Sequence, residues 1–242
     1  VNRSADGLGQ GPLGTAAEFI AVPEAQAVPL DDETGFEEAA CFGIPGLTAA
    51  HAVNLVVGSG KKRVLVTGAA SSVGHYVTQM LAATGIEVIA TASAQKQPIA
   101  LEAGAKAAID YRTEPVAEKV LEANGGQGVD AVVDLDFSST SLLIGTPAIA
   151  PHATIFCYGS NDMGDLSVPF RDLLFKSITL SFFLVYELTV DERAAAIDRL
   201  HGFIRSGKAE TRLEEPIPLE NIAEAHALVE EGRANGNVVL RI

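Results

Sequence analysis

Cysteine, basic charge and long apolar runs are all scarce in this chain of 242 residues. Its two cysteines, Cys41 and Cys157, lie far apart and do not make the disulfide framework of a small secreted domain. Lysine and arginine number 17 against 31 acidic residues, and the formal net charge of −14 argues against nucleic acid and anionic membrane surfaces as partners. No run approaches the ~18 apolar residues of a membrane span, and no signal peptide is recognisable. We therefore expect a cytoplasmic, globular protein.

The shortage of cysteine also bears on metal binding. A structural zinc site of the four-cysteine type needs clustered cysteines, which two distant residues cannot supply. The histidines follow no ligand spacing and are interpreted as structural or surface residues; they are His51, His75, His152, His201 and His226. We expect no metal site, and we expect Cys41 to pack as a small apolar residue.

Residues 63–93 carry the strongest positive signal in the sequence. Val64-Leu65-Val66 is a short apolar run typical of a buried parallel strand, and a turn of small residues, 68–74, follows it. That turn opens a helix with one apolar face, and a second strand is predicted at 87–91. A helix N-terminus behind such a turn offers backbone N–H groups and a positive dipole end to a pyrophosphate.

This strand–turn–helix–strand pattern predicts a dinucleotide-binding βαβ unit. The candidate phosphate contacts are Ala70, Ser71, Ser72 and Val73. The loop departs from G-x-G-x-x-G, because serines occupy the place of the middle glycine. The alternative is that the small residues serve only strand–helix packing.

The residues after the second strand indicate which dinucleotide is bound. NAD-specific sites usually place a carboxylate there to bind the ribose 2′-hydroxyl. This chain has Thr91-Ala92-Ser93-Ala94-Gln95-Lys96 instead, which offers a hydroxyl at Ser93 and an ammonium at Lys96. These groups suit a 2′-phosphate, so NADP(H) is favoured over NAD(H). The alternative is that Lys96 is a solvated residue at the start of the next helix.

The rest of the chain alternates between strand and helix patterns. Alternation of this kind predicts an α/β fold, a doubly wound parallel sheet of the Rossmann type. Further strands are expected at 107–110, 129–134, 154–158 and 177–185, and helices at 96–103, 115–124 and 191–206. Beyond them, the pattern predicts a strand at 212–219, a helix at 220–231 and a closing strand at 238–242.

Several segments, in order, resemble one family. GTAAEFIAVP (14–23), IPGLTAAHAV (44–53), GAASSVG, TASAQK, IDYR and the ending IPLENIAEAHALVEEGRANGNVVLRI are similar to the zinc-independent medium-chain dehydrogenases/reductases, in the quinone oxidoreductase and enoyl reductase branch. The resemblance implies NADP(H) as cofactor. It also implies further contacts to that cofactor, at Thr48, Tyr111, Gly159, Ser160, Phe183, Val185 and Arg233.

The resemblance carries an expectation about domains. Members of the family have a barrel-like, GroES-like catalytic domain before the segment that matches 14–23, whereas 13 residues precede that segment here. Val1-Asn2-Arg3-Ser4 resembles a family segment near the active site. We expect residues 44–206 to form the Rossmann domain, and residues 1–43 with 207–242 to form a reduced remnant of the catalytic domain.

The function implied by the resemblance is transfer of a hydride from NADPH to a small α,β-unsaturated carbonyl or quinone. Tyr186 is a weak candidate for the proton donor, because it follows the predicted nicotinamide strand; water, or an ordinary half-buried role for this tyrosine, are the alternatives. A second function class stays open, a non-redox protein on the same scaffold. It would be a nucleotide-binding module or subunit, or an enzyme with altered chemistry.

The last predicted strand of the sheet bears on assembly. Residues 177–183, SITLSFF, are strongly apolar, and an open edge of this kind invites pairing with another chain. The resemblance implies a homodimer joined at this edge by antiparallel pairing. The alternative is that the remnant domain covers the strand.

Overall fold

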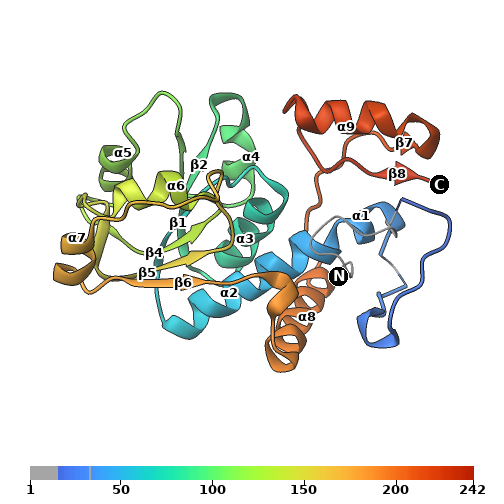
Figure 1. Cartoon of the computed structure of the whole chain (residues 1–242), viewed down its shortest axis with the longest axis horizontal. Coiled ribbons are helices and arrows are strands. Elements are labelled where there is room, and N and C mark those ends of the chain that lie inside the picture. Colours follow the sequence, from blue (N-terminus) through green and yellow to red (C-terminus); the bar gives the residue numbers. More distant parts are fainter. Residues whose placement is uncertain (1–15, 33) are drawn as a thin grey trace. The chain divides into compact units, whose positions relative to one another are not determined.

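The computed structural model describes residues 16–32 and 34–242 (Figure 1). Two compact units make up the described chain. The larger is Pro45–Ala209, and the smaller joins the described residues up to Ile44 with Glu210–Ile242. The interpretation of the smaller unit as a catalytic-domain remnant remains a prediction, and Val1-Asn2-Arg3-Ser4 lies outside the described residues.

The larger unit is built on a six-stranded sheet in the order β3-β2-β1-β4-β5-β6, in which all neighbours are parallel. The strands are β1 Arg63–Val66, β2 Glu87–Ala92, β3 Ala107–Asp110, β4 Val129–Asp134, β5 Ile149–Cys157 and β6 Thr179–Phe182. The direction in which strands are added reverses between β1 and β4, which is the switch point of a dinucleotide-binding sheet. The predicted Rossmann architecture is therefore confirmed.

Helices cover both faces of this sheet (Figure 1). On one face α3 packs on β1 and β2 with α4, α2 and α8 beside it; their bounds are α2 Leu47–Ser59, α3 Ser72–Ala83, α4 Gln97–Glu102 and α8 Val190–Arg205. On the other face, an apolar cluster joins the strands to α5 Val116–Ala123, α6 Phe137–Thr140, η4 Ser141–Leu143 and α7 Phe170–Phe175. Two short turns complete the unit, η3 Ala94–Lys96 and η5 Val185–Glu187.

Burial of α3 is more complete than its sequence pattern predicts. The pattern indicates one apolar face, but every residue from Gly74 to Leu81 is buried. The reason is that α3 lies between the sheet on one side and α2 and α4 on the other. Polar side chains in the middle of this helix are therefore part of the core.

One helical segment among the described residues, Phe42–Ser59, is long and apolar enough to cross a membrane by length and composition alone. It comprises η2 Phe42–Gly46, which contains Pro45, and α2. More than half of its length is buried within the structure, which is the usual reason for a core helix to be this apolar.

Some element boundaries differ from the sequence expectations. β5 begins five residues earlier than expected and includes His152, whose φ of 61° lies in the left-handed region. β6 is shorter than expected, because Ser177 also adopts a left-handed φ, 52°, and η5 begins at Val185, within three residues of the end of the strand. β7 is confined to Ile217–Pro218, since Pro216 before it and Pro218 within it cannot donate to a strand ladder.

The smaller unit has little regular structure. Its parallel pair consists of β7 and β8 Leu240–Arg241, and the remaining elements are η1 Glu24–Gln26, α1 Phe36–Ala40, η6 Leu219–Asn221 and α9 Ile222–Glu230. Within it Arg241 forms an ion pair of 2.9 Å with Glu37 of α1, so the last strand and α1 are held together.

A buried carboxylate connects β4 to its neighbours. The hydroxyls of Thr67 and Thr140 both donate to Asp134 Oδ1, at 2.9 and 2.7 Å, and the backbone N–H of Asp136 donates to it as well. Asp134 is fully buried, and its Oδ2 has no hydrogen-bond partner in the described structure. Burial therefore raises the pKa of this carboxyl, although the two threonine hydrogen bonds oppose the shift.

This pKa shift predicts a pH-dependent effect of Asp134→Asn. Because the folded state holds the Asp134 proton more tightly than the unfolded chain does, the wild-type protein loses stability as the pH rises above the unfolded pKa of about 4. Asparagine keeps an acceptor for the threonines and carries no charge to desolvate. The unfolding free energy of the variant relative to wild type, from urea titrations, should therefore increase between about pH 4 and pH 7.

The matched control for this experiment is Asp198→Asn, which removes an exposed carboxylate from α8. Its stability difference from wild type should change little over the same range. Parallel pH profiles for Asp134→Asn and wild type would contradict this account of the carboxylate.

Candidate functional site

The first candidate region is the turn between β1 and α3. In a parallel sheet all strands deliver their carboxyl ends to one edge, and this turn lies there beside the switch point. Ser71 is the N-cap of α3, and its hydroxyl accepts a hydrogen bond of 3.1 Å from the Gly74 N–H. Ala70, Ser71, Ser72 and Val73 thus form the start of a helix whose backbone N–H groups and positive dipole end face the sheet edge.

Close backbone approaches shape this turn. A Cβ on Gly74 would lie 2.3 Å from the Gly68 carbonyl oxygen, and one on Gly159 would lie 2.7 Å from the Leu135 carbonyl oxygen. Gly68 itself has a φ of 62°. The absence of side chains at these points lets the loops after β1, β4 and β5 come together, which leaves their backbone open to a ligand. This geometry fits the pyrophosphate of a dinucleotide.

The second region lies at the ends of β2 and β3. The pairing of Ala92 with Asp110 places Ser93 and Tyr111 side by side, as the next residue of each strand. Lys96 ends the short turn η3, which Ser93 begins as its N-cap. The structure therefore brings together Ser93 and Lys96, which are predicted for a 2′-phosphate, and Tyr111, a further predicted contact to the cofactor.

Arg112 adds a cation to this region that the sequence reasoning missed. Its guanidinium lies 5.5 Å from the centre of the Tyr111 ring, and its Nε donates to the Tyr111 hydroxyl at 3.3 Å. The signal was visible in the sequence as the arginine directly after the tyrosine in IDYR. Stacking keeps the guanidinium beside the ring of Tyr111, which is itself a predicted cofactor contact.

A carboxylate does lie at this end of the sheet, on Asp110, but it is already engaged. The hydroxyl of Thr113 donates to Asp110 Oδ2 at 2.6 Å, and the N–H of Arg112 donates to Oδ1 at 3.1 Å. The Thr113 hydrogen bond holds the pKa of Asp110 below its usual range. Asp110 stabilises its own turn and so differs from the ribose-binding carboxylate of NAD-specific sites.

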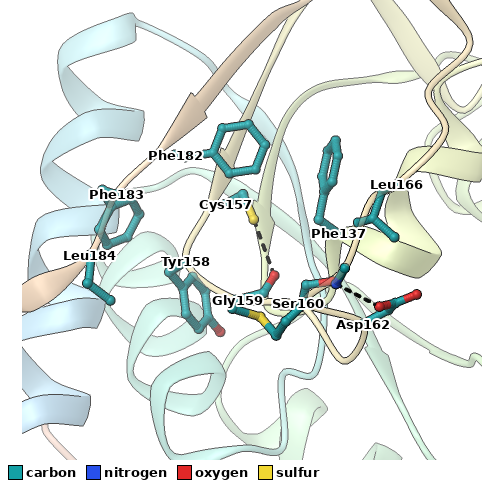
Figure 2. Close-up of a pocket in the computed structure, with 12 residues that line it drawn as sticks. Phe137, Cys157, Tyr158, Gly159, Ser160, Asp162, Leu166, Phe182, Phe183 and Leu184 are labelled. Carbon is teal, nitrogen blue, oxygen red and sulfur yellow. Dashed lines mark hydrogen bonds between the residues drawn. The ribbon is translucent and has the colours of Figure 1, made fainter. Parts of the chain in front are cut away.

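The third region is a pocket of about 440 Å³ at the carboxyl ends of β4, β5 and β6 (Figure 2). Apolar side chains dominate it. Phe137 and Phe182 meet edge to face with ring centres 5.1 Å apart, and Tyr158 lies 6.1 Å from Phe183. The lining residues are Phe137, Cys157, Tyr158, Gly159, Ser160, Asp162, Met163, Gly164, Leu166, Phe182, Phe183 and Leu184.

The cofactor contacts predicted for this end of the sheet lie in three places. Gly159, Ser160 and Phe183 line the pocket, whereas Val185 and the proton-donor candidate Tyr186 lie just beyond it in η5. Thr48 is buried near the start of α2.

His51 connects α2 to the pocket. It lies one turn after Thr48, and its ring meets Phe183 edge to face at 4.9 Å. Burial lowers the pKa of His51, and the nearby Glu192 opposes the shift. An uncharged imidazole therefore supports the aromatic wall from the side of α2.

Tyr158 is the pocket residue that sequence reasoning missed. Its buried hydroxyl makes no hydrogen bond within 3.5 Å in the described structure, although the Ser71 side chain lies near enough to act against the rise of its pKa. Burial, reinforced by the neighbouring charge of Asp134, raises the pKa of this phenol, so it stays protonated at neutral pH. A buried donor without an acceptor is costly, and a ligand oxygen would relieve that cost. The signal was a tyrosine between a buried strand and Gly159.

The remaining predicted residues lie elsewhere or bear on metals. Arg233 belongs to the smaller unit, where its Nε pairs with Glu231 at 2.6 Å.

Cys157 donates from its Sγ to the Gly159 carbonyl, and burial raises its pKa to about 11, as it does for Cys41. Within the described residues no group of three or more His, Cys, Asp or Glu side chains could hold a metal ion. That the protein is metal-free remains a prediction.

Comparisons with known proteins agree with this geometry. Residues 103–240 match the family model described as zinc-binding dehydrogenase. A quinone oxidoreductase of Pseudomonas aeruginosa is 30% identical over 95% of this chain and 72% of its own length.

Solved structures are similar as well. An NAD-dependent alcohol dehydrogenase has a TM-score of 0.81 and 29% identity, and covers 95% of this chain. The Escherichia coli quinone oxidoreductase in complex with NADPH has a TM-score of 0.77 and 28% identity, and covers 90% of this chain. The chain spans 65% and 69% of these two proteins. It therefore belongs to the medium-chain dehydrogenase/reductase superfamily, with quinone oxidoreductases among its relatives.

Proposed function

We propose that this chain binds NADP(H) and serves an oxidoreductase that transfers a hydride to an α,β-unsaturated carbonyl or a quinone. The observation that carries the proposal is the alignment of three regions along one sheet edge: the turn at Ser71, the basic and hydroxyl group at Ser93 and Lys96, and the aromatic pocket beside Tyr158. Their order along the edge matches a dinucleotide laid across the switch point.

Each region has a distinct role in this proposal. Ala70 to Val73 bind the pyrophosphate through the start of α3, and Ser93, Lys96 and Tyr111, with Arg112, bind the 2′-phosphate. Gly159, Ser160 and Phe183 flank the nicotinamide, with Thr48 on the adjoining helix. NADPH, when bound, supplies the hydride; a proton then completes the reduction of the acceptor.

Tyr158 is a better candidate than Tyr186 for a hydrogen-bond donor in this site. It lines the pocket, whereas Tyr186 does not, and its raised pKa keeps the phenol neutral. A neutral phenol can stabilise negative charge that develops on an acceptor oxygen. Water remains an alternative source of the proton.

The first test concerns cofactor choice. NADP(H) should bind at least about tenfold more tightly than NAD(H), a difference of ~1.4 kcal/mol. Lys96→Ala should remove most of this preference, because it deletes a cation from the proposed binding site of the 2′-phosphate. Calorimetric titration with both cofactors measures the two affinities, and Lys106→Ala is a control that removes an exposed lysine paired with Glu87. Equal affinities for the two cofactors in the wild-type protein would refute the assignment.

The second test concerns activity. We expect weak NADPH oxidation by this chain alone with small quinones or enones, because the family resemblance implies that a full catalytic domain contributes to the positioning that lowers the barrier. Absorbance of NADPH follows the reaction, and treatment with a chelator should leave the rate unchanged if the protein is metal-free. Turnover near ~10 per second would mean that no further domain is needed. Tight NADPH binding with no turnover on any acceptor would favour the non-redox alternative.

The third test concerns assembly. We propose a homodimer formed at the β6 edge, because β6 pairs only with β5 in the described structure and exposes 61% of Phe182. The Phe183 N–H donates to the Cys157 carbonyl of β5, so by alternation the Phe182 N–H faces the open side of β6. Phe182→Pro removes this backbone donor and the exposed ring from the edge and should convert the dimer to a monomer, as measured by light scattering. The control is Thr189→Ala, which alters the cap of α8 away from the edge. A wild-type protein that is monomeric at micromolar concentration would exclude the dimer.

A further inference from the structure

The charge of the residues that line the aromatic pocket restricts which ligands can bind there more than the shape of the pocket does. Among its lining residues Asp162 is the one carboxylate, its side chain is exposed to solvent, and none of the others is a lysine, arginine or histidine. Burial raises the pKa of Cys157 to about 11 and raises that of Tyr158 as well. Figure 2 shows Asp162 at one end of the pocket and Phe183 at the other. The lining therefore combines an apolar, aromatic interior with a single carboxylate at its exposed end.

No cation of the surrounding segment offsets this charge. Between Phe137 and Leu184 the sequence contains one arginine and one lysine. Arg171 lies over the Phe175 ring at 5.0 Å, and Lys176 donates to the carbonyls of Ile144 and Thr146 at 2.7 and 2.6 Å. Both are held away from the pocket lining. The neighbouring helices α2 and α3 contain no lysine or arginine at all.

A second carboxylate, that of Asp136, lies next to the loop that carries Asp162. Asp136 accepts hydrogen bonds from the N–H and the side-chain amide of Asn161, at 2.9 and 2.8 Å, and from the hydroxyl of Ser139 at 2.6 Å. Burial alone would raise its pKa, but these hydrogen bonds outweigh burial and hold the pKa below its usual range. Asp136 is therefore ionised, and it fixes the loop that carries Asp162.

We propose that this pocket selects uncharged, planar acceptors and disfavours anionic ones, with Asp162 as the residue that sets the selectivity. The inference rests on the proposed oxidoreductase function and narrows its substrate class. A neutral quinone or enone meets only aromatic and aliphatic walls. A thioester of coenzyme A, or a sulfonated quinone, brings negative charge toward a carboxylate with no cation in the lining to balance it.

The test compares a neutral naphthoquinone with the same compound carrying a sulfonate group, and adds crotonyl-CoA as a thioester. The measured quantity is the ratio of kcat/KM for the neutral and the sulfonated quinone. Asp162→Asn should lower this ratio about threefold and Asp162→Lys about tenfold, and both changes should shrink at high salt. Asparagine retains the side-chain oxygen that accepts from the Gly164 N–H at 2.9 Å, so the turn is preserved.

The matched control is Asp165→Asn, which removes the same charge from the same loop but from a residue outside the lining. Its ratio should equal that of wild type. Any of three results would overturn the proposal. The ratio could be unchanged in Asp162→Asn, it could shift equally in Asp162→Asn and Asp165→Asn, or crotonyl-CoA could be reduced as efficiently as the neutral quinone.

Failure of the proposed function has a different signature. It would show as no NADPH binding and no reduction of either quinone. Calorimetric binding of the two quinones, measured without NADPH, then still decides the inference: Asp162→Asn should strengthen binding of the sulfonated compound about threefold relative to the neutral one. An unchanged binding ratio would reject Asp162 as the determinant.

Discussion

The close contact between the chain segments that follow β1, β4 and β5 is the constraint on which this site depends. Gly68, Gly74 and Gly159 leave no room for a Cβ there, since each would lie within 3 Å of a neighbouring atom. Thr67 and Asp134 join the strand ends below this contact. If the loops stood further apart, the turn at Ser71 and the pocket beside Tyr158 would no longer border the same groove of the sheet edge.

Charge is distributed unevenly along that edge. Lys96 and Arg112 lie at the β2 and β3 side, whereas the pocket at the β5 and β6 side has Asp162 as its acidic side chain. In a chain with a formal net charge of −14, this contrast gives the proposed ligand a direction: its 2′-phosphate at the basic end and its uncharged ring at the acidic, aromatic end.

The sequence was sufficient to predict the sheet, because short apolar strands alternate with helices and each β–α turn has a recognisable composition. Boundaries were less predictable. The early start of β5 depends on His152 in a left-handed conformation, which single-sequence patterns do not reveal. The full burial of α3 depends on α2, which packs on it from an earlier part of the chain, so an amphipathic pattern could not show it.

The parts of the site that depend on backbone conformation and local composition could be predicted from the sequence. The parts that depend on which side chains lie next to one another were less predictable. Ser71 in place of a glycine first counted against a phosphate turn, yet its φ of −77° lies in a region open to any residue, and its hydroxyl caps α3. The serine thus supplies a helix cap that a glycine would lack. Tyr158 and Asp162 were missed for the opposite reason. What distinguishes them is a missing hydrogen bond in one case and a missing counter-charge in the other, and neither absence can be recognised before the surrounding residues are in place.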